Sequence, residues 1–188
     1  RTKIRLIYVR GIYTMNSRNL LTAVIAFVII AFSSTFIVDE REVVIKFRLG
    51  EIVSAYDNPG LYFMIPFLNN VKKYDSRLLT MDSKPEQFLT SEKKNVIVDS
   101  FVKWRISDPK NFYRSSKGDE RIGVNRLSQI VNDLTKSEFS KRTVNDVVSG
   151  DRVEIMNKVT KEANQLSQTL GITVVDVRLK KVDLPDEV

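Results

Sequence analysis

Residues 96–106, VIVDSFVKWRI, contain the clearest strand signal in the sequence. Their even positions are mostly apolar, whereas their odd positions carry the charged residues Asp99, Lys103 and Arg105. Because successive side chains of a strand point to opposite faces, this alternation predicts a strand with one face in a core and the other in solvent.

The segments around this strand predict an α+β domain. Residues 43–82 are rich in β-branched and aromatic residues and contain the turn signal Asn58-Pro59-Gly60, which predicts several short strands. The apolar period then becomes helical over residues 119–139 and 153–170, and a last strand is expected at 172–181. Strands followed by helices and one returning strand indicate an antiparallel-rich sheet with helices packed on one face.

An uncharged apolar segment, Leu20–Val38, precedes this domain, and we expect it to form a single transmembrane helix. Its nineteen residues would extend over about 28 Å as a helix, close to the hydrocarbon thickness of a bilayer. The residues expected to contact lipid in this anchor are Leu20, Val24, Phe27, Ile30, Phe36 and Val38.

The net charge of +7 is concentrated at the N-terminus. Five basic residues and no acidic ones precede residue 39, which leaves 25 basic and 23 acidic residues for the remainder. A basic tail over residues 1–19 predicts a cytoplasmic N-terminus, with residues 39–188 across the membrane. The nearly balanced charge of that domain is not the distribution of a nucleic-acid-binding protein.

A cleaved signal peptide is a second interpretation of the apolar segment. If Met15 is the true start, Arg18 forms a short basic region and Ala31-Phe32-Ser33 is an acceptable cleavage site. The apolar run is longer than a usual signal core, which favours a retained anchor. Residues 1–14 would then lie upstream of the start, and the domain is exported in either case.

The residue types that most enzymes need do not occur in this chain. It contains no His and no Cys, so imidazole and thiolate nucleophiles, bases and metal ligands are excluded. Its seven glycines are scattered singly and form no phosphate-binding loop. A Ser–Lys dyad stays open because both residue types are common, although no spacing marks one. We therefore predict no catalytic, metal-binding or cofactor-binding residue, and no cofactor.

A second apolar run, residues 61–68, lies downstream of the anchor. The simpler interpretation is a buried strand. The alternative is an apolar edge that rests on the bilayer, with Tyr62 and Phe63 at the level of the headgroups. The residues that would make this membrane-edge contact are Leu61, Tyr62, Phe63, Ile65 and Phe67.

The chain also carries short motifs in an informative order. They are Asp39-Glu40-Arg41, Pro59-Gly60-Leu61, Ile65-Pro66-Phe67, Asp75-Ser76-Arg77, Thr80-Met81-Asp82, residues 90–94, 96–100 and 103–108, Leu170-Gly171-Ile172, residues 174–178, Leu184-Pro185 and Glu187-Val188. In this order, behind one anchor, they resemble the band 7 family, also called the SPFH or prohibitin-homology family. Residues 115–149 match more loosely, residues 1–14 have no counterpart, and the family's C-terminal coiled coil would begin where this sequence stops.

The resemblance, closest to bacterial, protease-associated members, implies a non-enzymatic scaffold. It implies a retained anchor in the inner membrane with the band 7 domain in the periplasm. The implied partners are a related HflK-like band 7 protein, further copies in a homo- or hetero-oligomer, membrane lipids, and a membrane-bound ATP-dependent protease of the FtsH type that the assembly regulates. In such an oligomer we expect Asp99, Lys103 and Arg105 to make subunit contacts that set register and partner choice.

Two other functions stay open at this point. A stomatin-like organiser of lipid microdomains has the same fold and no protease partner. A membrane-tethered hydrolase would need a Ser–Lys pair.

Overall fold

The computed structural model describes residues 17–147 and 152–183 of the 188-residue chain. The elements are α1 (Ser17–Ser33), β1 (Thr35–Val38), β2 (Glu42–Arg48), β3 (Glu51–Tyr56), β4 (Gly60–Phe63), β5 (Asn69–Asp75), β6 (Leu79–Asp82), β7 (Glu86–Leu89), β8 (Asn95–Ile106), α2 (Pro109–Ser116), α3 (Glu120–Phe139), α4 (Arg152–Ser167) and β9 (Ile172–Asp183). The predicted cytoplasmic tail, except Ser17–Asn19, lies outside the described residues, as do the start at Met15 and the C-terminal residues after which the coiled coil is expected to begin.

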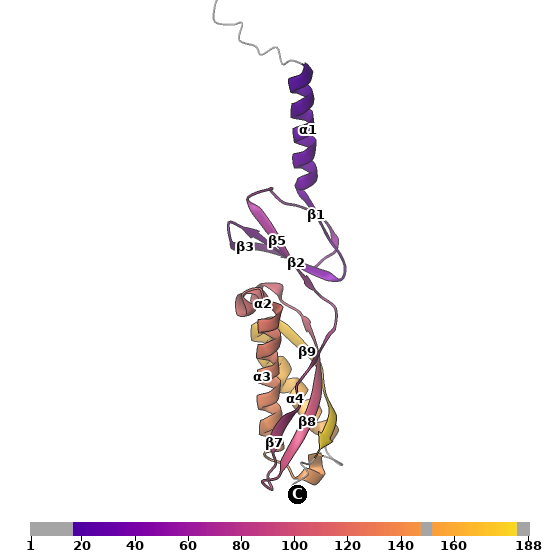
Figure 1. The fold of residues 1–188 in the computed structure, drawn as a ribbon, viewed down its shortest axis with the longest axis vertical. Helices are drawn as coiled ribbons and strands as arrows, with labels where there is room; N and C mark the ends of the chain where they lie inside the picture. Colours follow the sequence, from indigo (N-terminus) through magenta and orange to yellow (C-terminus); the bar gives the residue numbers. More distant parts are fainter. Residues whose placement is uncertain (1–16, 148–151, 184–188) are drawn as a thin grey trace, which may run out of the picture.

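Strand β8 is the centre of the larger sheet, here called the distal sheet. It pairs antiparallel with β9 along one edge, and with β6 and β7 in succession along the other. Its even-numbered residues are buried, with Val96 and Val102 at 0% exposure, under helices α3 and α4, which lie together on one side of the sheet (Figure 1). The alternating strand and the α+β architecture predicted from the sequence are both confirmed.

Both edges of the distal sheet are partly obstructed to a further strand. On the β9 edge, the backbone N–H of Val174 donates to Asn164 at 3.1 Å and that of Val177 donates to Thr160 at 3.0 Å, so side chains of α4 take up backbone groups of the strand. On the opposite edge, the pairing register shifts by one residue between β6 and β7, around Pro85, which has no N–H to donate. Bulges, proline and covering helices are recurrent ways of blunting sheet edges.

Two smaller sheets connect the distal sheet to α1. One has the strand order β3–β2–β5 and the other consists of β1 and β4 (Figure 1). Side chains alternate along β2, so that Val43, Ile45 and Phe47 join the main core, whereas Val44 packs with Phe36 and Val38 of β1 in a second, smaller core. The β3–β2–β5 sheet is therefore apolar on both faces.

The predicted helix Leu20–Val38 is wrong in its extent. Helix α1 ends at Ser33, and Thr35–Val38 pairs antiparallel with β4. Phe36 and Val38, predicted as anchor residues, are 8% and 2% exposed in the smaller core. A run of β-branched and aromatic residues favours a strand once a partner strand is available, and β4 supplies that partner.

The start of α2 is tied to the start of β9. Asp108 caps α2 by accepting hydrogen bonds from the backbone N–H groups of Lys110 and Asn111, and the backbone N–H groups of Ser107 and Asp108 donate to the carbonyl of Gly171. Gly171 has φ +74°, and a Cβ at this position would lie 2.2 Å from the carbonyl oxygen of Asp108. Only glycine fits this contact, which fixes α2 against the distal sheet.

An ion cluster around a buried carboxylate joins the two long helices. The Glu138 side chain on α3 is 3% exposed and contacts Lys158 of α4 at 2.8 Å and Lys141 at 3.0 Å. The hydrogen bond from Lys158, helped by that from Lys141, lowers the pKa of Glu138 below its ordinary value. This carboxylate therefore favours the folded state whenever it is ionised.

We expect the substitution Glu138→Gln to lower the free energy of unfolding at pH 7 by about 1–3 kcal/mol, the range for a buried hydrogen bond to a charged group. Because the folded-state pKa is lowered, the stabilisation is present above the ordinary pKa of 4.5 and is lost as the pH falls through the folded value. Urea denaturation at several pH values should show the difference from the parent protein shrinking in acid. Glu154→Gln is the control, because Glu154 pairs with Arg142 but is 72% exposed, so its loss should be small. Equal effects of the two substitutions would contradict the assignment.

Candidate functional site

Large apolar side chains are exposed together around the end of α1. We call this group the apolar rim, and its members are between 47% and 103% exposed. They are Ile37, Leu49, Leu61, Phe63, Ile65, Phe67 and Leu68. They come from β1, β4, the β2–β3 turn and the loop that joins β4 to β5. A cluster of apolar residues on a water-exposed protein surface indicates an interaction site.

The β1–β4 pair divides its side chains between the smaller core and the rim. Ile37 pairs directly with Leu61, and Phe63 lies on the same face opposite Thr35. The alternate residues Phe36 and Tyr62 face the other way, where their rings stack with centroids 5.8 Å apart. This two-stranded sheet is therefore apolar on its outer face as well as on its inner face.

Two rim residues adopt a backbone conformation that bulky side chains avoid. Leu49 has φ +51° and Phe67 has φ +68°, both in the left-handed region. They are 81% and 103% exposed, and the N–H of Leu49 donates to the carbonyl of Leu68 at 3.2 Å, which holds the two turns side by side. Such a conformation costs roughly 1–2 kcal/mol for a residue other than glycine. Neither side chain recovers that cost by packing inside the fold.

The rim is fixed in position relative to α1. Directly after the helix, Ser34 accepts a hydrogen bond from the backbone N–H of Met64 at 2.8 Å, and its hydroxyl donates to the Met64 carbonyl. The small sheets lie directly below the end of α1 without an intervening linker (Figure 1). The eight large apolar side chains described on α1 are 46–80% exposed and point to all sides of the helix.

Within residues 17–147 and 152–183, no helix reaches the length and apolarity of a membrane span.

The structure distributes the predicted contact residues unevenly. Leu61, Phe63, Ile65 and Phe67 all lie on the rim, whereas Tyr62 faces the smaller core and donates its hydroxyl to the Asn58 carbonyl at 3.0 Å. Of the predicted anchor residues, Leu20, Val24 and Phe27 are exposed on α1, and Ile30 also belongs to α1. Sequence reasoning missed Ile37, Leu49 and Leu68. A leucine placed before glycine in a hairpin turn, where Asn is favoured, was the available signal for Leu49.

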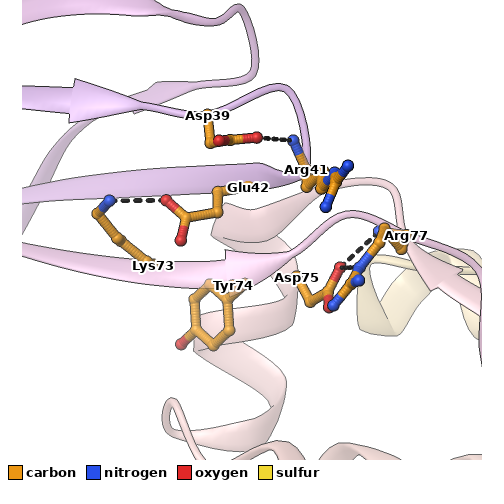
Figure 2. A pocket seen from close by; sticks show the side chains of 7 residues that line it. All are labelled: Asp39, Arg41, Glu42, Lys73, Tyr74, Asp75 and Arg77. Carbon is orange, nitrogen blue, oxygen red and sulfur yellow. Dashed lines mark hydrogen bonds and ion pairs between the residues drawn. The ribbon is translucent and has the colours of Figure 1, made fainter.

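A shallow pocket of about 280 Å³ lies where β1 turns into β2 and where β5 ends (Figure 2). It brings together the motifs Asp39-Glu40-Arg41 and Asp75-Ser76-Arg77, because the N–H of Ser76 donates to the Arg41 carbonyl at 2.9 Å. In each motif the aspartate accepts from the backbone N–H two residues later, at 3.0 Å and 2.8 Å.

The charges in this pocket are largely paired with one another. Arg77 contacts Asp75 at 2.6 Å and lowers the pKa of Asp75, and Lys73 contacts Glu42 at 2.6 Å. The Tyr74 ring points away from these carboxylates and packs edge-on against Phe112, with its pKa raised to about 12 by burial (Figure 2). The hydrogen bond from Ser76 to Arg41 joins the two loops, and these ion pairs lie beside it. No group of three metal-ligating side chains occurs in the described parts of the chain.

The predicted subunit contacts lie on the outer face of the distal sheet, opposite the helices. Asp99, Lys103 and Arg105 project from β8 on this side and are half-buried or exposed. Nearby charges are paired, as in Lys180–Asp82 at 2.9 Å and Arg178–Asp176 at 2.8 Å. Among the described residues, none of the three predicted contacts forms an ion pair, although Asp99 adds to the effect of Asp82 in raising the pKa of Lys180.

Comparison with known proteins relates the domain that follows α1 to one family. Residues 36–188 match the family described as SPFH domain / Band 7 family. The chain is 39% identical over 181 residues to Protein HflC of Haemophilus influenzae, which covers 91% of this chain and 61% of that protein. It is 35% identical to Protein HflC of Buchnera aphidicola subsp. Acyrthosiphon pisum, and the match covers 93% of this chain and 63% of that protein. It is 31% identical to the Modulator of FtsH protease HflC of Escherichia coli K12, and the match covers 91% of this chain and 65% of that protein.

These matches confirm the family resemblance drawn from the motifs, including its protease-associated bacterial branch. The chain spans less than two thirds of the length of each of these relatives.

We expect Leu49→Asn to leave the stability unchanged or to raise the free energy of unfolding by up to about 1 kcal/mol, because Asn tolerates the left-handed conformation better than Leu. Phe67→Asn should behave in the same way. Urea denaturation of both variants measures this, with the buried Phe112→Ala as a control that should be strongly destabilised. A loss of more than about 1 kcal/mol at Leu49 or Phe67 would show that these side chains support the fold rather than a surface function.

Proposed function

Because this chain belongs to the SPFH domain / Band 7 family, we propose that it is a membrane-anchored, non-catalytic scaffold that multimerises and regulates a membrane-bound protease of the FtsH type. The observation that carries the proposal is the apolar rim, fixed at the base of a helix that is apolar on all sides. In this proposal α1 inserts in the inner membrane with its N-terminus in the cytoplasm, and the band 7 domain stands in the periplasm.

The position of the rim favours a domain that contacts the membrane interface directly over one that is connected to the membrane by a flexible linker. The hydrogen bonds between Ser34 and Met64 leave no slack between α1 and the β4–β5 loop. An inserted α1 would therefore press Phe63, Phe67 and Leu49 against the lipid surface. Transfer of apolar and aromatic side chains from water to this depth lowers their free energy, which offsets the conformational cost of the left-handed backbone at Leu49 and Phe67.

The protease-regulating part of the proposal rests on the relatives and on the chemistry of the chain. The E. coli relative is named as a modulator of FtsH protease. The chain has no His and no Cys, and the pocket between β1 and β5 contains the ion pairs Arg77–Asp75 and Lys73–Glu42. A regulator without an active site acts by assembly, for which a related HflK-like subunit and further copies of the chain are the proposed partners.

Membrane contact can be measured by tryptophan quenching in vesicles that contain brominated lipid. We expect Phe63→Trp and Phe67→Trp to be quenched by shallow bromines, whereas Leu89→Trp, which lies on exposed β7 at the other end of the distal sheet, should not be. The native Trp104 is 2% exposed and gives a constant background. Quenching at Leu89 alone, or at none of the three positions, would contradict a membrane-resting rim.

Native membranes test the protease partner. Crosslinking followed by purification of the tagged chain should recover an FtsH-like protease together with an HflK-like protein, and removing the chain should change the degradation rate of membrane substrates. Recovery of lipid alone would instead favour an organiser of lipid microdomains. Labelling by serine-directed probes would favour a hydrolase.

A further inference from the structure

A groove of about 410 Å³ lies between helix α3 and the edge of the distal sheet that β6 and β7 form. We call it the edge groove. Met81 and Glu86 line it from the strands and Val124 lines it from α3, which lies beside β7 (Figure 1). The edge groove shares no residue with the apolar rim or with the pocket between β1 and β5, so none of the roles described so far uses it.

The α3 side of the edge groove is a stripe of uncharged polar side chains. They recur at helical spacing and are Asn125, Ser128, Gln129 and Asn132. Other exposed positions of the same helix carry charge, as at Arg121, Arg126 and Asp133. Amides and hydroxyls can both donate and accept hydrogen bonds. This stripe therefore suits a ligand that presents donors and acceptors side by side without a net charge.

The sheet side of the edge groove ends in unpaired strand backbone. β6 and β7 pair with β8 alone, so alternate residues of each strand turn their N–H and C=O groups away from β8. Within the described residues, these outward groups have no hydrogen-bond partner. On the β9 edge, side chains of α4 take up backbone N–H groups. Here Asn132 instead donates to the Glu86 side chain at 2.6 Å and leaves the β7 backbone free.

A buried hydroxyl next to the edge groove also lacks a partner. Ser83 lies between Asp82 and Lys84, which both line the groove, and it is 8% exposed. Its Oγ makes no hydrogen bond within the described residues. A buried hydroxyl without a partner costs free energy. The break between β6 and β7 is thus incompletely hydrogen-bonded at its centre.

We infer that the edge groove binds an extended segment of another polypeptide, which adds to this edge as a short strand and places a side chain between the sheet and α3. A polypeptide repeats N–H and C=O groups at the spacing of a strand edge, and a groove beside that edge receives its alternate side chains. The register shift at Pro85 limits such a strand to the four residues of β6 or the four of β7. A flexible chain fits this limit, whereas a rigid long strand of another copy, such as the twelve-residue β9, does not.

The proposed regulation of a protease, on which this assignment rests, identifies the class of chain. Membrane proteins on their way to degradation expose unfolded segments whose backbone groups are unpaired. The α3 stripe carries no charge, so recognition depends on the backbone of the bound segment and tolerates many sequences. The edge groove would hold such segments close to the protease.

Fluorescence anisotropy measures this binding directly, with the full-length protein in detergent micelles and a fluorescein-labelled peptide of the sequence Ser-Thr-Val-Gln-Val-Thr-Ser. We expect saturable binding of this peptide. The same peptide with N-methyl groups on its three central residues should bind about tenfold more weakly or worse, because N-methylation removes the donors that strand pairing needs.

Two variants and a matched control assign the binding to the edge groove. Ser128→Tyr fills the groove and should weaken binding by about tenfold or more, and Gln129→Ala, at an exposed position, by about three- to tenfold through the loss of one hydrogen bond. Ser137→Tyr is the control, because it makes the same change at an exposed position of α3 outside the groove and should leave binding unchanged. Circular dichroism and urea denaturation confirm that each variant is folded.

A benzophenone at the central residue of the peptide locates the site by photocrosslinking and mass spectrometry. Adducts on β6, β7 or α3 support the assignment, whereas adducts on residues 61–68 of the apolar rim would overturn it. Undiminished binding of the methylated peptide, or undiminished binding to both groove variants, would also overturn it. A protein that binds no peptide but still recovers an FtsH-like protease from membranes would overturn the edge groove and leave the proposed function standing. Peptide binding by a protein that recovers no protease would support the groove and contradict the proposed function.

Discussion

The hydrogen-bonded position of β8 is the constraint on which the rest of the distal structure depends. A strand that pairs along both edges must bury one face, and the buried side chains of β8 define the surface on which α3 and α4 lie. The same pairing fixes β9, and Gly171, the residue just before this strand, holds the start of α2 through its carbonyl. The outward residues of β8, which include Lys103 and Arg105, lie on the opposite face of the sheet from these helices.

The large apolar side chains fall into two groups, those of the buried main core and those of the exposed apolar rim. The main core stabilises the fold in the ordinary way, with side chains such as Phe112, Leu127 and Phe139 at 0% exposure. The side chains of the apolar rim are about half exposed or more, and Leu49 and Phe67 have left-handed backbone conformations that bulky residues avoid. Surfaces that cost stability are typical of functional sites, where a requirement outside the fold determines the residue.

Much of this fold could be predicted from local pattern, because period-two alternation identifies β8 and the helical period identifies α3 and α4. The end of α1 could not, since Thr35–Val38 is a plausible continuation of an apolar helix until β4 pairs with it. The rim was only half predicted, because residues 61–67 are contiguous whereas Ile37 and Leu49 reach it through pairing and turn geometry. The hydrogen bonds from β9 to Asn164 and Thr160 could not be predicted, because no sequence pattern indicates which side chains of α4 contact which residues of β9.

If the chain is anchored in a membrane as proposed above, the partial covering of the β9 edge by α4 affects how neighbouring copies meet. Molecules confined to a plane with a common orientation meet at high effective concentration, and identical long strands at equal height are the starting point for continuous intermolecular sheets. Strand β9 is twelve residues long and would be such a starting point if its edge were bare. Because α4 occupies part of that edge, crowding can promote side-chain contacts between neighbours while growth into a fibril is resisted.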